Sequence, residues 1–191
     1  MESTKEFQEE TRRYFDRVAE DYDASYDGRF VRCMYREVVR RAASLPGDRV
    51  LDLGCGSGIL SIAALVLGAE RASAVDIDPK AVDVAYENAA LNGIGKERYT
   101  VRAGDVLTDR ALAAELAQER YQLVLANIVA DVIIPLAPQV PGLLAEGGVF
   151  LCSGILDSRA HEVAEALARS GLRVTRKRER NGWAALEAVL A

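Results

Sequence analysis

Apolar residues along this 191-residue chain gather in short runs that alternate with longer stretches of helical periodicity. The run Val50–Leu53 has the length of a buried strand, and the uncharged stretch Ile59–Leu67 suits a helix packed against a sheet. This alternation continues to the end of the chain and predicts an α/β domain. The predicted strands are 50–53, 72–76, 99–103, 121–127, 149–153, 172–178 and 183–190, and the predicted helices are 59–67, 79–92, 109–119, 131–145 and 157–170.

Turn residues change this regular pattern at two places. Asn181-Gly182 lies between the last two strands and is typical of a tight hairpin, so these strands should be antiparallel. Pro135, Pro138 and Pro141 fall inside the predicted helix 131–145. Because proline removes a backbone donor and clashes with the preceding turn, we expect that helix to be broken.

The front of the chain predicts amphipathic helices of its own. Residues 30–44 have helical spacing, which Pro46-Gly47 ends. Residues 2–27 are rich in charge, but several of their side chains fall close to one helical face, namely Phe7, Thr11, Tyr14, Phe15 and Val18. Two roles fit this first helix: it packs against the following domain, or it closes over a ligand as a lid.

Charge limits the classes of partner that the chain suits. It has 24 Lys and Arg residues against 29 Asp and Glu, so its net charge of −5 gives no overall attraction to a nucleic acid. The basic run 173–180 is the one exception. We expect it to be a solvated sheet edge that discourages aggregation, rather than an RNA-binding stripe.

Cysteine and histidine usage narrows the chemistry further. Cys33, Cys55 and Cys152 show no C-x-x-C spacing, which indicates reduced thiols in a cytoplasmic protein. The one histidine, His161, falls in a predicted surface helix and cannot build a metal site from several imidazoles. No apolar run reaches membrane-spanning length, and the charged N-terminus is unlike a signal peptide. We expect a cytoplasmic protein without metal or membrane partners.

The strongest local signal is a glycine turn directly after the first strand. Gly54, Gly56 and Gly58 follow Asp52 at every second position, and backbone N–H groups at the next helix start would face a ligand. A dinucleotide fingerprint would need glycine where Ile59 stands. A carboxylate before the turn would instead attract a cationic amino-acid moiety, which makes Asp52 a candidate ligand.

This order, Asp-x-Gly-x-Gly-x-Gly, resembles motif I of the class I S-adenosylmethionine-dependent methyltransferases. The resemblance implies a doubly wound, Rossmann-like α/β fold with a seven-stranded, mostly parallel sheet and a C-terminal antiparallel hairpin. It also implies S-adenosylmethionine as cofactor and S-adenosylhomocysteine as product.

Acidic and amide side chains at the ends of later strands complete the candidate site. Asp76, followed by Ile77, is predicted to bind the ribose hydroxyls, whereas Asp78 before Pro79 suits a helix N-cap. Asp105 is placed to contact an adenine amino group, although an acid in a turn fits as well. Asn127 offers a carbonyl that could orient an amine, or it caps the next helix. The carboxyl ends of the strands meet in one crevice near the switch in strand order, so we expect Asp52, Asp76, Asp105 and Asn127 to converge there.

Longer motifs make residues 49–189 similar to the catalytic domain of the PrmA family, which methylates amino groups of protein eleven of the large ribosomal subunit. These motifs are Leu51–Leu60, Val75–Pro79, Glu87-Asn88-Ala89, Ala126–Asp131 and Ser153–Leu156.

Residues 14–23 resemble the entry segment of small-molecule methyltransferases of the quinone-biosynthesis type. The separate front domain and the Gly-Thr-Gly-Thr-His-Pro-type loop of PrmA enzymes are not in this sequence. We therefore expect residues 1–48 to form a helical lid, with Tyr14 and Tyr22 near the cofactor, and residues 49–191 to form the cofactor-binding domain of a single compact unit.

The sequence predicts methyl transfer to an amine, with Asn127 orienting the acceptor and solvent taking its proton. The acceptor expected from the PrmA resemblance is a protein lysine or N-terminal amine. A small molecule beneath the front segment is an alternative, and a module that binds S-adenosylmethionine without turnover is another.

Overall fold

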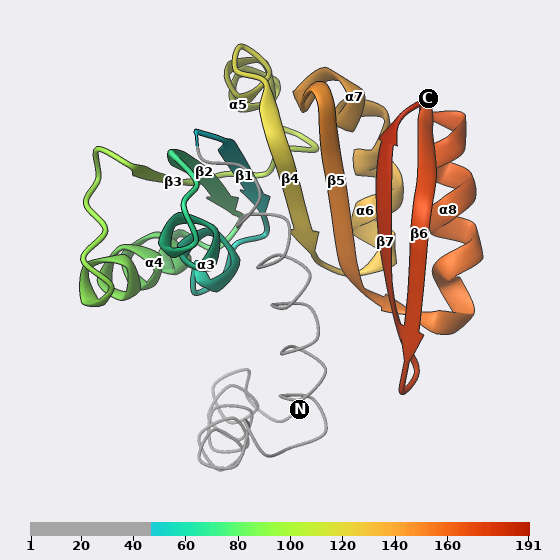
Figure 1. Cartoon of the computed structure of the whole chain (residues 1–191), viewed down its shortest axis with the longest axis horizontal. Helices are drawn as coiled ribbons and strands as arrows, with labels where there is room; N and C mark the ends of the chain where they lie inside the picture. The colour runs from blue at the N-terminus through green and yellow to red at the C-terminus, as the bar shows by residue number, and fades with distance from the viewer. Residues whose placement is uncertain (1–46) are drawn as a thin grey trace, which may run out of the picture. The chain divides into compact units, whose positions relative to one another are not determined.

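The strands of this domain form one sheet with helices on both faces (Figure 1). The computed structural model describes residues 47–191, which all fall in the compact unit 37–191. The predicted lid, with Tyr14 and Tyr22, lies outside the described residues. Within them the sheet has seven strands in the order β3-β2-β1-β4-β5-β7-β6. The strands are β1 Arg49–Leu53, β2 Arg71–Asp76, β3 Tyr99–Ala103, β4 Tyr121–Asn127, β5 Leu144–Leu156, β6 Leu172–Arg180 and β7 Trp183–Leu190.

The helices cover the sheet in two layers, with α3 and α4 on one face and α6 and α8 on the other (Figure 1). The α-helices are α3 Ile59–Val66, α4 Pro79–Leu91, α5 Arg110–Leu116, α6 Ala130–Leu136, α7 Val140–Leu143 and α8 Ala160–Arg169, and the 3-10 helices are η1 Ala137–Gln139 and η2 Asp157–Arg159. The predicted seven-stranded, doubly wound α/β fold is confirmed.

The order of the strands creates a switch point between β1 and β4. The chain runs outward from β1 through β2 to β3 and then returns to place β4 on the other side of β1, with all these neighbours parallel. A crevice is expected at the carboxyl ends of such a pair. On the far side, β7 runs antiparallel to β5 and β6. The hairpin residues Asn181 and Gly182 have φ angles of 59° and 85°, as a type I′ turn requires, and the predicted antiparallel hairpin is confirmed.

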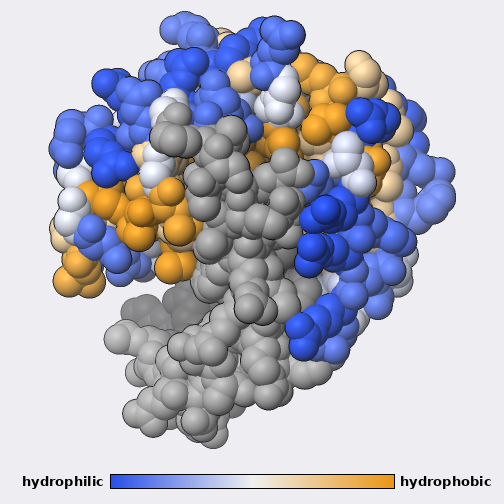
Figure 2. Space-filling view, viewed as in Figure 1, coloured by the Kyte–Doolittle hydropathy of each residue, from blue (hydrophilic) through white to orange (hydrophobic). Residues whose placement is uncertain are grey.

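The main core lies between the sheet and the layer of α6 and α8. Phe150, Ile133 and Leu167 are fully buried there. On the opposite face α4 buries only alanines, among them the fully buried Ala85, whereas α3 buries Leu60, Ile62 and Leu65 beside smaller residues. Figure 2 shows hydrophilic residues along β6 and hydrophobic residues over α3 and α4.

Two predicted boundaries near the end of the sheet were wrong. The strand predicted over 149–153 spans Leu144–Leu156, because its backbone continues through Gly147 and Gly148 instead of starting after them. A Cβ at Gly148 would lie 2.8 Å from the carbonyl oxygen of Tyr121, so the missing side chain permits close pairing with β4. The register of the β4–β5 pair shifts there. β6 also extends beyond the predicted 178 to Arg180.

The helix predicted over 131–145 is broken, as its prolines indicated. It is replaced by α6, η1 and α7, with Pro135 inside α6. Each short piece packs an apolar side chain into the core, for example Ile133 and Val140. Among the described helices none is long and apolar enough to cross a membrane.

Arg98, just before β3, binds carbonyl groups in the last turn of α3 and in the loop that follows it. Its Nη2 donates to the carbonyl oxygens of Leu65 at 3.1 Å and Ala69 at 2.7 Å, and its Nε donates to that of Glu70 at 3.2 Å. The last carbonyls of a helix have no partner within the helix, and a cation there also favours the helix dipole.

Replacing Arg98 with methionine should therefore lower the free energy of unfolding by about 1–2 kcal/mol, since the side chain keeps its length but loses its donors. Urea unfolding followed by circular dichroism measures this difference. Arg71→Met changes an exposed arginine on the neighbouring strand and should stay within about 0.5 kcal/mol of the parent. Equal stability of the two variants would contradict the capping role.

Candidate functional site

The glycine turn is fastened to the neighbouring strand β2. The backbone N–H groups of Gly54 and Cys55 donate to the carbonyl oxygen of Val75, at 2.8 and 3.1 Å. The N–H of Gly56 donates to Oδ2 of Asp76 at 2.7 Å. The turn after β1 and the end of β2 therefore form one hydrogen-bonded unit at the switch point of the sheet.

The three glycines of the turn are required for different reasons. A Cβ at Gly54 would collide with Ile128, and one at Gly58 would lie 2.6 Å from the hydroxyl of Tyr99, so packing excludes side chains there. Gly56 has a φ of 51° and open space where its Cβ would be. Among these glycines it is Gly56 that leaves room for a ligand to approach the backbone.

Asp76 is held by backbone donors on both carboxylate oxygens. Oδ2 accepts from Gly56, and Oδ1 accepts from the N–H of Asp78 at 2.9 Å. A carboxylate has about four lone-pair sites, so two remain for ligand hydroxyls. Asp78 is the N-cap of α4, because its side chain accepts from the N–H of Lys80 at 2.9 Å and Pro79 begins the helix. The predicted capping role of Asp78 is confirmed.

Asp52, the predicted ligand before the glycine turn, is buried at the end of β1. It is only 1% exposed, and its Oδ2 accepts from Oγ and N–H of Ser61 at 2.7 and 3.2 Å. Burial raises the pKa of Asp52 to about 6, despite these two bonds, which favour the charged form. As a strand residue between Leu51 and Leu53, Asp52 is bonded to Ser61 of α3 beneath the glycine turn, and its Oδ1 has no hydrogen-bond partner within the described residues.

A hollow of about 310 Å³ opens at the carboxyl ends of the strands beside the turn. Its apolar walls come from both sides of the switch point, and four of the predicted site residues border it: Gly54, Asp76, Ile77 and Asp105. The rest of its lining is Leu53, Val75, Gly104, Val106, Leu107, Ile128, Val132 and Leu136. Ile77 is 72% exposed, which is unusual for isoleucine and leaves its side chain available to a ligand.

Asp105 shapes the loop that closes one side of this hollow. Its Oδ1 accepts from the N–H of Leu107 and its Oδ2 from the hydroxyl of Thr108, both at 2.9 Å. The turn role that the sequence left open is thus present. The same residue lines the hollow, so its remaining lone pairs can serve a ligand.

Asn127 ends β4 next to Ile128, which lines the hollow. Its Oδ1 accepts a hydrogen bond from the hydroxyl of Ser153 at 2.8 Å. The N-cap of α6 is Val129, with no side-chain cap bond, so Asn127 does not cap that helix. The side chain is exposed at the crevice.

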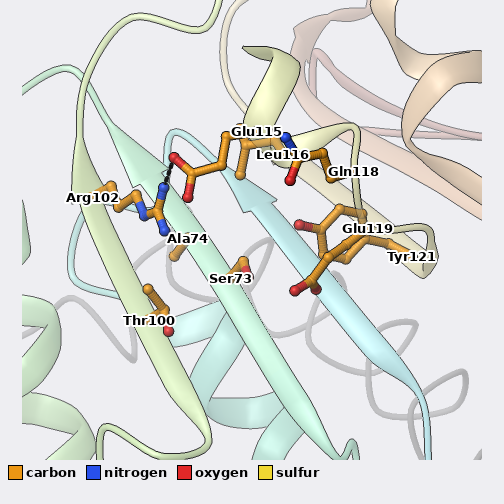
Figure 3. Close-up of a pocket in the computed structure, with 9 residues that line it drawn as sticks. All are labelled: Ser73, Ala74, Thr100, Arg102, Glu115, Leu116, Gln118, Glu119 and Tyr121. Atoms are coloured by element: carbon orange, nitrogen blue, oxygen red, sulfur yellow. Dashed lines mark ion pairs between the residues drawn. The ribbon is translucent and has the colours of Figure 1, made fainter. Parts of the chain in front are cut away.

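A second hollow, of about 160 Å³, lies between β2, β3, β4 and α5 (Figure 3). Arg102 and Glu115 form an ion pair across it, and Ser73, Thr100 and Tyr121 lie on its sheet side. Tyr121 is the first residue of β4, at the opposite end of that strand from Asn127. None of the predicted site residues lines this hollow.

Two side-chain contacts of the site could not be read from residue spacing. The bond from Gly56 to Asp76 depends on how tightly the turn folds against β2, and the bond from Ser153 to Asn127 depends on the register of β4 and β5. Val132 and Leu136 are four residues apart on α6, and this spacing is the one signal for their shared position in the hollow.

Other candidate chemistry is limited in the described part of the chain. The thiols of Cys55 and Cys152 are free and buried, and burial raises the pKa of each to about 12. Residues 47–191 contain no cluster of three or more side chains that could hold a metal ion. His161 is exposed on α8, 3.7 Å from Glu165, as expected for a surface histidine.

Comparison with known families gives a consistent assignment. A family model for ribosomal protein L11 methyltransferase (PrmA) matches residues 37–190. The ribosomal protein L11 methyltransferase of Agathobacter rectalis is 42% identical over 134 residues, which cover 70% of this chain and 42% of that protein. The protein of the same name from Pseudomonas paraeruginosa is 46% identical over 140 residues, covering 73% and 44%. The chain spans less than half the length of these curated relatives.

Solved structures share the fold. The ribosomal protein L11 methylase of Lactobacillus delbrueckii subsp. bulgaricus is 30% identical with a TM-score of 0.70, covering 82% of this chain and 78% of that one. Magnesium protoporphyrin IX methyltransferase from Synechocystis PCC 6803 has a TM-score of 0.64 at 23% identity, covering 83% and 78%. At that identity the second likeness shows the fold alone.

The pKa of Asp52 predicts a pH dependence of stability that can be isolated with one variant. Because the pKa is about 6 in the folded state and 3.8 in its unperturbed state, the contribution of Asp52 to stability is fully present below pH 3.8 and is lost as the pH rises through 6. Asp52→Asn removes this titration while keeping an acceptor for Ser61. Between pH 4 and pH 7 the stability of the variant relative to the parent should rise by about 2–3 kcal/mol.

Denaturant unfolding of both proteins at a series of pH values measures this change, and titrating groups that do not interact with Asp52 cancel in the difference. A difference between parent and variant that stays constant from pH 4 to pH 7 would show that Asp52 is not destabilised in its charged form.

Proposed function

The chain belongs to the ribosomal protein L11 methyltransferase (PrmA) family, and from this premise we propose that it binds S-adenosylmethionine and transfers a methyl group to an amine. The observation that carries the proposal is the placement of Asp76. Its carboxylate is fastened to the glycine turn and borders the apolar hollow at the switch point of the sheet. Such a group is suited to bind the ribose of a nucleoside.

The residues present fit S-adenosylmethionine in three respects. A hollow of about 310 Å³ with apolar walls is large enough to take a purine ring, and Ile77 and Asp105 border it. Asp76 retains lone pairs for two ribose hydroxyls. The open space at Gly56 lets the amino-acid end of the cofactor approach the turn. Bound there, S-adenosylmethionine would supply an activated methyl group, whose bond to the sulfonium sulfur would break as an N–C bond to an uncharged amine forms, with S-adenosylhomocysteine as the leaving group.

The role of the protein in such a transfer is mainly to bind and align the amine. Asn127 is the last residue of β4, the strand that pairs with β1 and its glycine turn. One lone pair of its Oδ1 accepts from Ser153, and the other remains available. That lone pair can accept an N–H of the acceptor and so direct the nitrogen lone pair toward the methyl group. His161 is exposed on α8, and no other described residue is a clear general base, so the amine proton passes to solvent.

The acceptor in this proposal is a protein amine, as in the relatives whose names specify ribosomal protein L11. The hydrophobic rim of the crevice supports an acceptor with an aliphatic stem. Val129, two residues after β4, and Leu156, the last residue of β5, are 55% and 50% exposed. Arg159 joins the two following helices by bonding Asp131 at 2.7 Å, which fixes this rim.

Removing the Asp76 carboxylate should weaken binding of the cofactor. Loss of charge-assisted hydrogen bonds typically costs about 1.5–3 kcal/mol, so Asp76→Ala should raise the Kd of S-adenosylmethionine roughly ten- to a hundredfold. Isothermal titration calorimetry measures the Kd, and Asp83→Ala on the exposed face of α4 is the matched control. An unchanged Kd in a folded Asp76→Ala protein would remove Asp76 from the ligand site.

Removing the Asn127 side chain should separate catalysis from binding. Asn127→Ala should keep the Kd of S-adenosylmethionine within about threefold, yet lower the transfer rate roughly a hundredfold, because orientation alone is worth several kcal/mol. The rate is measured with methyl-labelled cofactor. Equal losses of affinity and rate would make Asn127 a cofactor ligand instead.

The same labelled cofactor tests the acceptor. Incubation with ribosomal protein L11, with small amines and with RNA in separate reactions should label the ribosomal protein. Label in small amines alone would favour the small-molecule alternative. Tight cofactor binding without label in any pool would favour a binding module and contradict the proposed transfer.

A further inference from the structure

Ser153 is a buried hydroxyl at the place where β5 meets the crevice. It is 1% exposed and lies between Cys152 and Gly154, two residues before the fully buried Ile155. A hydroxyl removed from water costs free energy unless it is bonded, and alanine would fill such a position without that cost. The hydrogen-bond partner of the Ser153 hydroxyl therefore indicates what a serine contributes at this buried position.

The partner is the exposed amide of Asn127. Residues 127 and 153 are register neighbours on the parallel strands β4 and β5. The Ser153 hydroxyl donates to Oδ1 of Asn127 at 2.8 Å, and the carbonyl oxygen of Ser153 accepts from the N–H of Ile128 at 3.1 Å. Ser153 thus binds both the side chain of Asn127 and the backbone that follows it.

Gly154, the next residue in β5, packs against the same part of Asn127 and Ile128. Its φ is 76°, and a Cβ there would lie 3.1 Å from Oδ1 of Asn127 and 3.1 Å from the carbonyl oxygen of Ile128. The pairing of β5 with β7 shifts register between Cys152 and Ile155. Bulges of this kind turn a side chain to a new direction and are common beside active sites.

In the structure these contacts hold the Asn127 amide in one of its two orientations, with the oxygen toward Ser153. The terminal torsion of asparagine is broad and roughly two-fold, so a free amide can exchange its oxygen and nitrogen by rotation. The hydroxyl of Ser153 donates to the amide oxygen in the observed orientation and leaves one lone pair of that oxygen uncommitted. After rotation the NH₂ group would occupy that place, and a donor there would oppose the N–H of an amine acceptor.

We propose that Ser153 is a positioning residue that fixes the amide of Asn127 with its carbonyl oxygen available to the acceptor amine. This inference rests on the proposed methyl transfer for its catalytic consequence, whereas the fixed orientation of the amide is a property of the protein alone. This orientation of the amide favours acceptors that can donate an N–H to Oδ1 of Asn127. An acceptor without a hydrogen to donate gains nothing from the arrangement.

The orientation is tested first without turnover, by the side-chain amide signals of Asn127 in ¹H–¹⁵N spectra of the full chain. Asn127→Ala identifies these signals by their loss. Ser153→Ala should shift or broaden them, Ser153→Thr should restore their positions by returning a hydroxyl, and Ser158→Ala, an exposed serine in η2, should leave them unchanged. Unchanged signals in Ser153→Ala would overturn the proposal.

The catalytic consequence is tested by a double-mutant cycle with methyl-labelled cofactor and ribosomal protein L11. Ser153→Ala should lower kcat about five- to tenfold, as expected for one hydrogen bond, and leave the Kd of S-adenosylmethionine unchanged. In the Asn127→Ala background the same change should have no further effect on kcat. An equal loss in both backgrounds would show that Ser153 does not act through Asn127 and would overturn the proposal.

The two experiments separate this inference from the function on which it rests. If the amide signals respond as expected but no pool of acceptor is labelled, then the orientation by Ser153 is supported and the proposed methyl transfer fails. If label is transferred but the amide signals and kcat ignore Ser153, then the transfer is supported and the positioning role fails. Should Ser153→Thr not fold, the cycle of alanine variants still decides between these results.

Discussion

The carboxylate of Asp76 is the contact on which the candidate site depends. It accepts one hydrogen bond from Gly56 in the turn after β1 and another from Asp78 at the start of α4. One side chain therefore joins two strand–helix connections that the chain builds separately. Because backbone donors hold both oxygens in place before any ligand arrives, little reorganisation is left for binding, which is the advantage of a preorganised polar site.

Asn127 is held in the same manner on the other side of the switch point. Its oxygen accepts a hydrogen bond from a buried hydroxyl of the adjacent strand, and the side chain is otherwise exposed at the end of β4. In both cases a polar group is exposed at the end of a parallel strand while a partner on a neighbouring element fixes it. Rigid strands and short loops carry both groups, so their separation is set by the sheet and not by mobile segments.

The sequence predicted most of the fold because hydrophobic periodicity and turn chemistry agree along this chain. Strands 99–103, 121–127 and 183–190 have the predicted bounds, and Asp78-Pro79 begins a helix as their chemistry requires. Asp52 shows the limit of this approach. A sheet covered on both faces buries either side of a strand, so spacing alone could not tell whether its carboxylate faces a ligand or lies beneath α3. The role of Gly147-Gly148 was similarly ambiguous, because a pair of glycines can lie in a turn before a strand or in a bulge within it.

The two halves of the site differ in how far apart their parts lie along the chain, and this bears on how the acceptor is selected. The turn and Asp76 come from one β1–α3–β2 unit, whereas Asn127 and Ser153 come from β4 and β5 and meet through strand register. In the proposed function the first pair binds cofactor and the second orients the acceptor. Changes at Ser153 or at the exposed rim residues Val129 and Leu156 therefore alter the acceptor half without touching a cofactor contact. In this proposal an enzyme with such an arrangement can keep one cofactor and change its methyl acceptor through a few residues at the carboxyl ends of β4 and β5.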